Sequence, residues 1–345
     1  MALGHFSLAF AEIGYFYLGL VLLILGNGFF KPNISSLLGT LYDKVPKKKD
    51  SGFTIFYMGI NLGGFLGPLV CGFLGETISW HLGFGAAGIG MLLGLLVFYF
   101  GKSSISSHLE HRKLTEAEPV AAGVEADRIK VILILAFFSI FFWMAFEQAG
   151  SSMNLFADRF TDRTLSGFTI PASVLQSFNP LLILVLAPLF SLFWKILEEK
   201  HLTPGFPVKF SLGLLFLGLG FVVLSFGAMG VTESNRAGIH WLLLAYLLHT
   251  VGELFLSPLG LSMVSKMAPL RLASLFFGLW FFSNAIAHYT AGALSGFMGS
   301  FDSLSRFFLV FFSTSLAAAG GLFLLRKKID RLAHANELKT ERRTG

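Results

Sequence analysis

The stretch KSSISSHLEHRKLTEAEPVAAGVEADRIK (102–130) decides the fold, because it is the only long polar stretch between apolar segments. Three apolar stretches precede it and six follow it, and each has about the 20 residues that a helix needs to cross a bilayer. Residues 1–11 are apolar but too short to span. The sequence therefore predicts an all-α, polytopic membrane protein with nine full transmembrane helices and a stub. The nine stretches are 14–41, 53–74, 82–101, 131–157, 172–194, 208–230, 239–265, 272–298 and 303–326.

Composition excludes several classes of protein. Of the 345 residues, 54% are hydrophobic and 13% are charged, about half of the roughly 25% charged residues of a soluble globular domain. The single cysteine, Cys71, excludes a disulfide framework and a metal site built from several thiolates. No His-x-x-x-His pair with an acidic ligand, GxSxG elbow or pair of intramembrane aspartates is present. We therefore expect that the protein is not an enzyme and that it binds no metal ion and no cofactor.

The basic residues predict the orientation. The net charge of +6 suggests nucleic-acid binding at first, but the lysines and arginines lie at the ends of the predicted spans. Alternate connections and the C-terminal tail carry nearly all of them, whereas the other connections carry only Arg159, Arg163, Arg236 and Arg306. Because basic loops stay in the cytoplasm, we expect a multi-pass protein of the cytoplasmic (inner) membrane with its C-terminus in the cytoplasm.

The polar stretch also divides the chain. The arrangement of the spans on its two sides resembles the six-plus-six arrangement of major facilitator transporters, whose halves are repeats. On that plan, the chain lacks about the first two and a half helices of the fold. The expected parts are a partial N-terminal bundle holding the end of helix three and helices four to six (1–101), a cytoplasmic linker (102–130), a C-terminal six-helix bundle (131–326) and a cytoplasmic tail (327–345).

Three charges lie within the predicted spans once the basic residues at the span ends are counted with the connections and tail: Lys31, Glu147 and Glu253. A charge at the bilayer centre costs about 2.5–3.5 kcal/mol even on a lenient scale, so such residues face a cavity, pair with each other or relay protons. The alternative is a structural ion pair, or a position close enough to a helix end to reach the interface. One lysine and two glutamates suit a zwitterion, since the ammonium attracts a carboxylate, one glutamate attracts an amine and the other carries a proton.

Polar side chains accompany these charges at helical spacing, which places them on one face of each helix. Several such faces predict a shared aqueous cavity, whereas interhelical hydrogen bonds, worth about 0.6 kcal/mol each, explain single residues only. Glycines repeat every four residues and predict close helix packing. The polar sets are Glu147, Ser151 and Asn154; Glu253 and Ser257; Trp280, Asn284 and His288; Tyr57 and Asn61; and Gln176 before Asn179. The glycines are Gly59, Gly63 and Gly67, with Gly90 and Gly94.

Six of these segments resemble, in order, helices four, five, seven, eight, ten and eleven of the proton-dependent oligopeptide transporters. That family consists of peptide/H⁺ symporters of the major facilitator superfamily. The resemblance implies proton-coupled symport of di- and tripeptides by alternating access. The segments are GNGFFKPNISSLLGTLY (26–42), FTIFYMGINLGGFLGPLV (53–70), FFWMAFEQAGSS (141–152), QSFNPLLILVLAPLF (176–190), GELFLSPLGLSMVSKMAP (252–269) and GLWFFSNAIAHYTAG (278–292).

The resemblance also implies residue roles. Lys31 matches the lysine that contacts the peptide carboxylate and takes part in proton coupling, and Glu253 matches the glutamate that receives the amino group. Asn61 and Asn179 match asparagines that hydrogen-bond the peptide backbone, and Trp280 matches a tryptophan that shapes the pocket. Glu147 matches the acidic residue of helix seven, which is linked to proton movement. His288 receives no role, because the family has a small or amide residue there. The expected substrate-binding residues are Lys31, Tyr57, Asn61, Asn179, Glu253, Ser257, Trp280 and Asn284, and the expected proton-coupling residues are Lys31, Glu147 and Glu253.

Two family features are absent from the sequence. The E-x-x-E-R motif of the first helix is missing, and the linker is too short for the two extra helices of many bacterial members. We therefore expect an N-terminally truncated member of the family. Two alternatives stay open: a remnant that inserts without transporting or acts as a partner subunit, and a relative that carries nitrate, an amino acid or another small solute.

Overall fold

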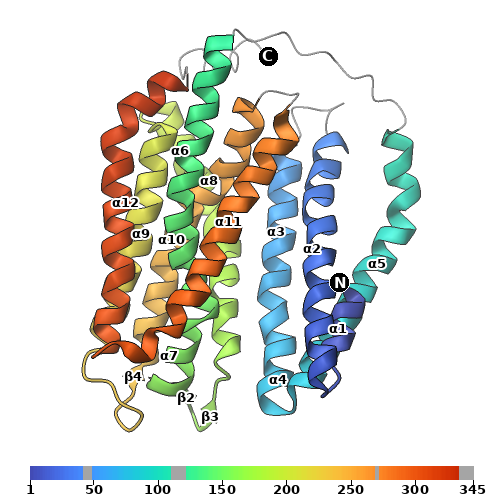
Figure 1. Ribbon diagram of the computed structural model, residues 1–345, viewed down its shortest axis with the longest axis vertical. Coiled ribbons are helices and arrows are strands. Elements are labelled where there is room, and N and C mark those ends of the chain that lie inside the picture. The colour runs from blue at the N-terminus through green and yellow to red at the C-terminus, as the bar shows by residue number, and fades with distance from the viewer. Residues whose placement is uncertain (42–48, 110–121, 269–271, 334–345) are drawn as a thin grey trace. The chain divides into compact units, whose positions relative to one another are not determined.

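The computed structural model describes residues 1–41, 49–109, 122–268 and 272–333, and nearly all of them are helical (Figure 1). Among the described residues, eight stretches are long and apolar enough to cross a membrane, which confirms the all-α, polytopic prediction. The ninth predicted span, 272–298, forms the 24-residue helix α11 (Ala273–Gly296) but is not among the eight, because Asn284 and His288 make it less apolar. The eight are Ile13–Lys31, Ile55–Thr77, Trp80–Ser103, Gly123–Phe160, Ser173–Glu199, Phe206–Gly227, Ile239–Leu256 and Leu304–Leu332.

The chain forms two compact units. Unit 1 comprises Met1–Glu116 together with Phe168–Leu184, and unit 2 comprises Ala117–Gly167 and Val185–Gly345. The division into bundles at 101 and 131 stays a prediction. Helices extend from both sides into the predicted polar linker, since α5 continues to Leu109 and α6 begins at Ala122.

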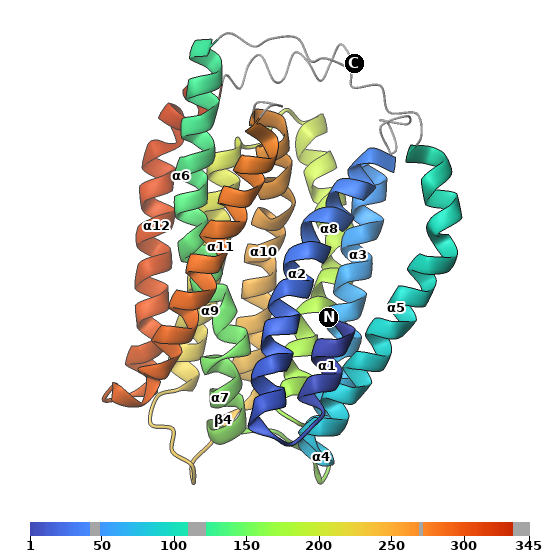
Figure 2. The same ribbon diagram turned by 45° about the vertical axis from the view of Figure 1, so that its right-hand side comes forward.

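Unit 1 begins with the short helix α1, which forms from the predicted stub and packs against α2 and α5 (Figure 2). Glycines allow this approach: a Cβ on Gly19 of α2 would lie 2.9 Å from the carbonyl oxygen of Gly4. The second predicted span is interrupted at Pro68, which has no N–H to donate, and continues through a π-helical turn. The bounds are α1 (Ala2–Leu8), α2 (Ile13–Leu41), α3 (Lys49–Gly67), η2 (Pro68–Gly72), α4 (Phe73–Thr77) and α5 (Trp80–Leu109), followed much later in the chain by β3 (Phe168–Thr169), η4 (Ser173–Ser177) and the start of α8 (Phe178–Glu199).

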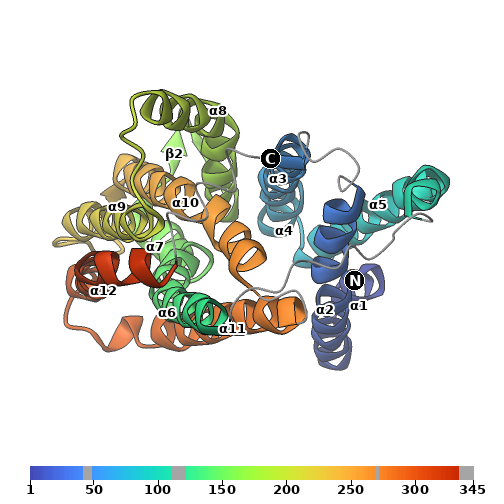
Figure 3. The ribbon, with the colours of Figure 1, turned by 90° about the horizontal axis from the view of Figure 1, so that it is seen from above.

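Unit 2 is organised around α9, which packs extensively against α12 and α10, while α6 packs against α11 and α12 (Figure 3). Gly213 of α9 and Gly252 of α10 bring two backbones together: a Cβ on Gly252 would lie 2.7 Å from the carbonyl oxygen of Gly213. Phe221, Phe308 and Phe311 are fully buried beside these helices. The further bounds are α6 (Ala122–Phe146), η3 (Glu147–Gly150), α7 (Ser152–Phe160), α9 (Phe206–Gly227), α10 (Ile239–Met267), η6 (Met298–Ser300) and α12 (Leu304–Leu332).

In the part of the chain that the structure describes, short strands occur only in connections. In unit 2, β1 (Thr161–Asp162) pairs in parallel with β4 (Ala237–Gly238). The strands β2 (Thr164–Leu165) and β3 pair across Ser166 and Gly167, which both have positive φ, as a tight two-residue hairpin requires. These two-residue strands leave the fold class unchanged.

The prediction that the regularly spaced glycines pack closely against a neighbouring helix is wrong. A Cβ on Gly59, Gly63, Gly67, Gly90 or Gly94 would meet no described neighbour within 4 Å. Spacing of four residues places small residues on one face, but it does not determine whether a neighbouring helix covers that face. The glycines that do meet a neighbouring helix, such as Gly213 and Gly252, stand outside the regular repeats.

Candidate substrate and proton-coupling residues

Helix α3 carries two of the predicted substrate residues in unit 1. Tyr57 is half-buried, and Asn61 is buried with its side-chain Nδ2 donating to the carbonyl oxygen of Tyr57 at 2.9 Å. The hydrogen bond between residues four apart fixes the amide of Asn61 against its own helix. Asn61 is therefore oriented by the residue that precedes it by one turn.

Asn179 lies at the start of α8, on the element that packs against α3 within unit 1. The hydroxyl of Ser177 donates to the carbonyl oxygen of Phe65 at 2.8 Å, and a Cβ on Gly64 would lie 3.2 Å from Cγ of Pro180. These contacts place the half-buried Asn179 and the amide of Asn61 on two adjacent elements. Lys31 lies on α2 of the same unit, where it is exposed.

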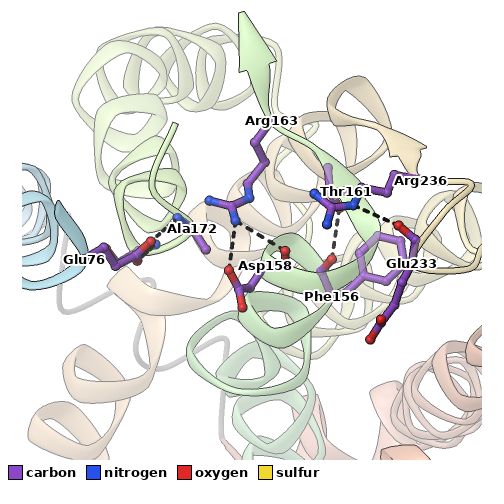
Figure 4. A network of polar contacts seen from close by, with 9 residues as sticks. Glu76, Phe156, Asp158, Thr161, Arg163, Ala172, Glu233 and Arg236 are labelled. Carbon is purple, nitrogen blue, oxygen red and sulfur yellow. Dashed lines mark hydrogen bonds and ion pairs between the residues drawn. The ribbon is translucent and has the colours of Figure 1, made fainter. Parts of the chain in front are cut away.

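Glu76 is an acidic residue that the sequence reasoning missed. It was expected outside the spans, but α4 continues the second span to Thr77. Its Oε2 accepts the backbone N–H of Ala172 at 2.8 Å, and its Oε1 accepts that of Ser173 at 2.7 Å (Figure 4). The carboxylate thus caps η4 where backbone N–H groups lack helical partners. It attaches the segment before α8 to unit 1.

In unit 2, Glu253 of α10 is buried with 8% of its surface exposed. Trp280 of α11 is also buried, at 5% exposed, and its indole lies against Gly260 of α10. Gly260 provides this room, since any Cβ there would collide with the ring. Ser257 lies in α10, but its side chain is outside the described residues.

Helix α11 links to α6 through a pair of buried serines. The hydroxyls of Ser283 and Ser139 lie 3.1 Å apart. Asn284 follows on α11 and is half-buried, and its Oδ1 has no hydrogen-bond partner among the described residues.

The predicted span 131–157 is broken at Glu147. Helix α6 ends at Phe146, a 3₁₀ turn covers Glu147–Gly150, and Ser151 has φ −127° and ψ −97°. Glu147 Oε2 lies 3.4 Å from Nδ1 of His288 on α11. The structure therefore brings a predicted proton-coupling residue together with a histidine for which no role was expected.

Gln148 is a second residue that the sequence reasoning missed. It is fully buried, its Nε2 donates to the carbonyl oxygens of Met144 and Ala291 at 3.2 Å each, and its Oε1 accepts the hydroxyl of Ser152 at 2.6 Å. The only signal in the sequence was its place beside Glu147. Among the described residues, no group of three or more His, Cys, Asp or Glu side chains is arranged to hold a metal ion.

Known proteins resemble the chain along most of its length. A peptide transporter of Yersinia enterocolitica, YePEPT, is 34% identical over 404 residues, which cover 96% of this chain and 79% of the relative. The di-/tripeptide transporter of Lactococcus lactis is 30% identical and covers 83% of this chain and 70% of its own length.

Solved structures and a family match agree with these relatives. The crystal structure of a peptide transporter POT in complex with sulfate superposes with a TM-score of 0.81 at 30% identity, covering 96% of this chain and 78% of that one. A mutant peptide transporter POT in complex with alafosfalin gives a TM-score of 0.80 at 31% identity. The PTR2 model of the POT family matches residues 1–117 and 111–310. The chain therefore belongs to the POT family of multi-pass membrane transporters.

Proposed function

We propose that the protein catalyses proton-coupled symport of di- and tripeptides across the cytoplasmic membrane by alternating access. The observation that carries the proposal is the 34% identity to a peptide transporter over 96% of the chain. The chemistry of the residues on each unit supports the same substrate class.

Unit 1 offers groups suited to a peptide carboxylate and backbone. Lys31 would supply a positive charge for the carboxylate, and amides are the natural partners of peptide N–H and C=O groups. Asn61 and Asn179 lie on adjacent elements of this unit, with Tyr57 fixing the amide of Asn61. We expect these residues to bind the peptide through hydrogen bonds that do not depend on its side chains.

Unit 2 offers acidic groups suited to an amine and a proton. Glu253 is a buried carboxylate in a membrane helix, so it is costly unless it binds a cation or a proton. Glu147 lies at a break in the predicted fourth span. We assign Glu253 to the peptide amino group and both glutamates to proton coupling, while Trp280, Ser257 and Asn284 would line the side-chain space.

We also propose that the protein lies in the inner membrane with its C-terminus in the cytoplasm. The alternation of basic and non-basic connections supports this orientation. Alkaline phosphatase or green fluorescent protein fused after Gly345 tests it. Fluorescence without phosphatase activity is expected, and the reverse pattern would overturn the orientation.

Uptake into proteoliposomes tests the function. The purified protein is reconstituted, labelled dialanine is added outside, and an inward proton gradient is imposed. The wild type should concentrate dialanine inside, and a protonophore should abolish the accumulation. Glu253→Gln should remove it too, because the neutral amide cannot attract an ammonium group. Glu233→Gln is the matched control, since Glu233 is exposed in a connection.

Each contrary outcome has a distinct meaning. Dialanine uptake that ignores the gradient would overturn proton coupling. Uptake of nitrate or of a single amino acid but not of dialanine would favour a relative with another substrate. Stable insertion without transport of any of these solutes would favour the interpretation that the chain is a non-transporting remnant.

A further inference from the structure

We propose that His288 and Glu147 form one proton-binding pair, so that His288 is a protonatable residue of the transporter. The proposal rests on proton-coupled transport as the function. It assigns a role to a histidine that stands where the sequence pattern leads one to expect a small or amide side chain. The observation behind it is the distance of 3.4 Å between His288 Nδ1 and Glu147 Oε2.

The pair lies where protons can reach it. Side-chain exposure is 51% for His288 and 35% for Glu147, in contrast to the buried Glu253. A charged or strongly polar pair facing lipid would be costly, so such residues face a water-filled path. The pair is therefore suited to exchange a proton with water.

Neighbouring contacts fix the pair. The carbonyl oxygen of Ala291, three residues after His288, accepts a hydrogen bond from Nε2 of Gln148, the residue after Glu147. Gln148 also binds Met144 and Ser152, one on each side of the break in the helix. The backbone that carries Glu147 is thus attached to α11 beside His288, and the approach of the two side chains does not depend on their own contact alone.

The chemistry of the two atoms favours a bound proton. A carboxylate oxygen and an unprotonated imidazole nitrogen are both acceptors and repel each other at this distance. A neutral imidazole avoids this repulsion by placing its single proton on Nδ1 and donating to the carboxylate, and a second proton on Nε2 gives an imidazolium that the carboxylate attracts. In the unloaded pair a neutral imidazole stands beside a carboxylate, with net charge −1. Uptake of one proton from water gives imidazolium and carboxylate with net charge 0, and release of that proton to water restores the first state.

The other titratable groups on elements that pack against η3 and α11 lie elsewhere or are engaged. Those at the start of α6 include an ion pair between Lys130 and Asp127, and the carboxylate of Asp158 at the end of α7 pairs with Arg163. On α10 His249 and Glu253 are buried. Within the described helix α11, the other titratable side chain is that of Tyr289, next to His288. The remaining titratable groups with described side chains are Glu125 and Arg128 on α6, Arg159 on α7, and His240 and the buried Tyr246 on α10.

Two transport assays separate proton coupling from peptide binding. Gradient-driven accumulation requires proton movement, whereas counterflow exchange of labelled for unlabelled dialanine does not require net proton flux. We expect His288→Gln to lower accumulation about tenfold or more while counterflow stays within about twofold of wild type. Its pH profile of accumulation should also change. The matched control is Tyr289→Phe, since Tyr289 is the adjacent exposed residue on α11.

The double variant tests whether the two residues act as one pair. Glu147→Gln alone should lower accumulation as His288→Gln does, and the combined variant should be no worse than either single one. Wild-type accumulation and pH profile in His288→Gln would overturn the pair. Equal loss of counterflow and accumulation would also overturn it, because that pattern indicates damaged structure. If the wild type itself fails to accumulate dialanine, the proposed function fails first.

Discussion

The two units bury membrane helices of similar composition to very different extents. In unit 1 the spans Ile13–Lys31 and Trp80–Ser103 have 6% and 11% of their residues buried, whereas in unit 2 the spans Phe206–Gly227 and Ile239–Leu256 have 61% and 56%. All four are apolar enough for a bilayer. Because lipid tails are as apolar as leucine, the apolar side chains of these helices gain little by packing against protein rather than lipid. Hydropathy therefore selects the helices that enter the membrane, but it does not determine how much of each helix is buried within its unit.

The largest effect should come from breaking the close contact in unit 2. Gly252→Leu places a Cβ 2.7 Å from the carbonyl oxygen of Gly213, and backbone on both sides cannot move aside cheaply. We expect a loss of about 1–3 kcal/mol in the free energy of unfolding, as for other overpacked sites. Tryptophan fluorescence during thermal unfolding in detergent measures it.

Gly63→Leu on α3 is the matched control for that substitution. A Cβ there meets nothing within 4 Å, so the change should stay within about 0.5 kcal/mol. Equal destabilisation by the two substitutions would contradict the contrast between the units.

An effect of similar size, but confined to one segment, should follow from removing the cap in unit 1. Glu76→Ala leaves the N–H groups of Ala172 and Ser173 without their acceptor, at a cost of about 1–3 kcal/mol for a buried donor. Because the cap is local, the loss should appear as faster hydrogen exchange in peptides covering 172–177. Thr77→Ala is the control, as its hydroxyl bonds only to its own helix at Phe73. Unchanged hydrogen exchange in Glu76→Ala would show that the cap does not stabilise this segment.

The smallest effect should come from the serine pair that joins α6 and α11. Each serine hydroxyl has one proton, which can donate instead within its own helix, from Ser139 to Ala136 and from Ser283 to Trp280, so these bonds compete with the contact between the two serines. Their mutual hydrogen bond should therefore contribute only about 0.6 kcal/mol, the average for interhelical bonds in membranes. A double-mutant cycle of Ser139→Ala and Ser283→Ala measures this coupling, and a value above about 2 kcal/mol would contradict the estimate.

Much of the fold is predictable from the sequence, because a membrane helix needs only a long apolar run. The predicted stretch 208–230 became α9 at Phe206–Gly227, and 14–41 became α2 at Ile13–Leu41. The break at Glu147–Gly150 was not predicted, because no proline marks it. Its polar partners come from α11, more than a hundred residues later in the chain.

The types of residue in the candidate site were predictable from the sequence, but the contacts between them were not. Helical spacing placed Trp280 and His288 on one face of α11, yet Trp280 is buried against Gly260 whereas His288 reaches Glu147. Glu76 gave no signal either, because its partners are backbone N–H groups of Ala172 and Ser173, which every residue type except proline supplies. Such contacts depend on tertiary structure, so spacing within one helix cannot reveal them.

The central claim, coupling of peptide and proton movement, is tested most directly by measuring both in one vesicle. Proteoliposomes containing a pH-sensitive dye hold the wild type or Lys31→Ala, and dialanine is added outside under an inward proton gradient. We predict that dialanine speeds acidification of the lumen in the wild type and has no effect in Lys31→Ala, with Lys102→Ala as the control. Dialanine entry in the wild type without added acidification would contradict the account.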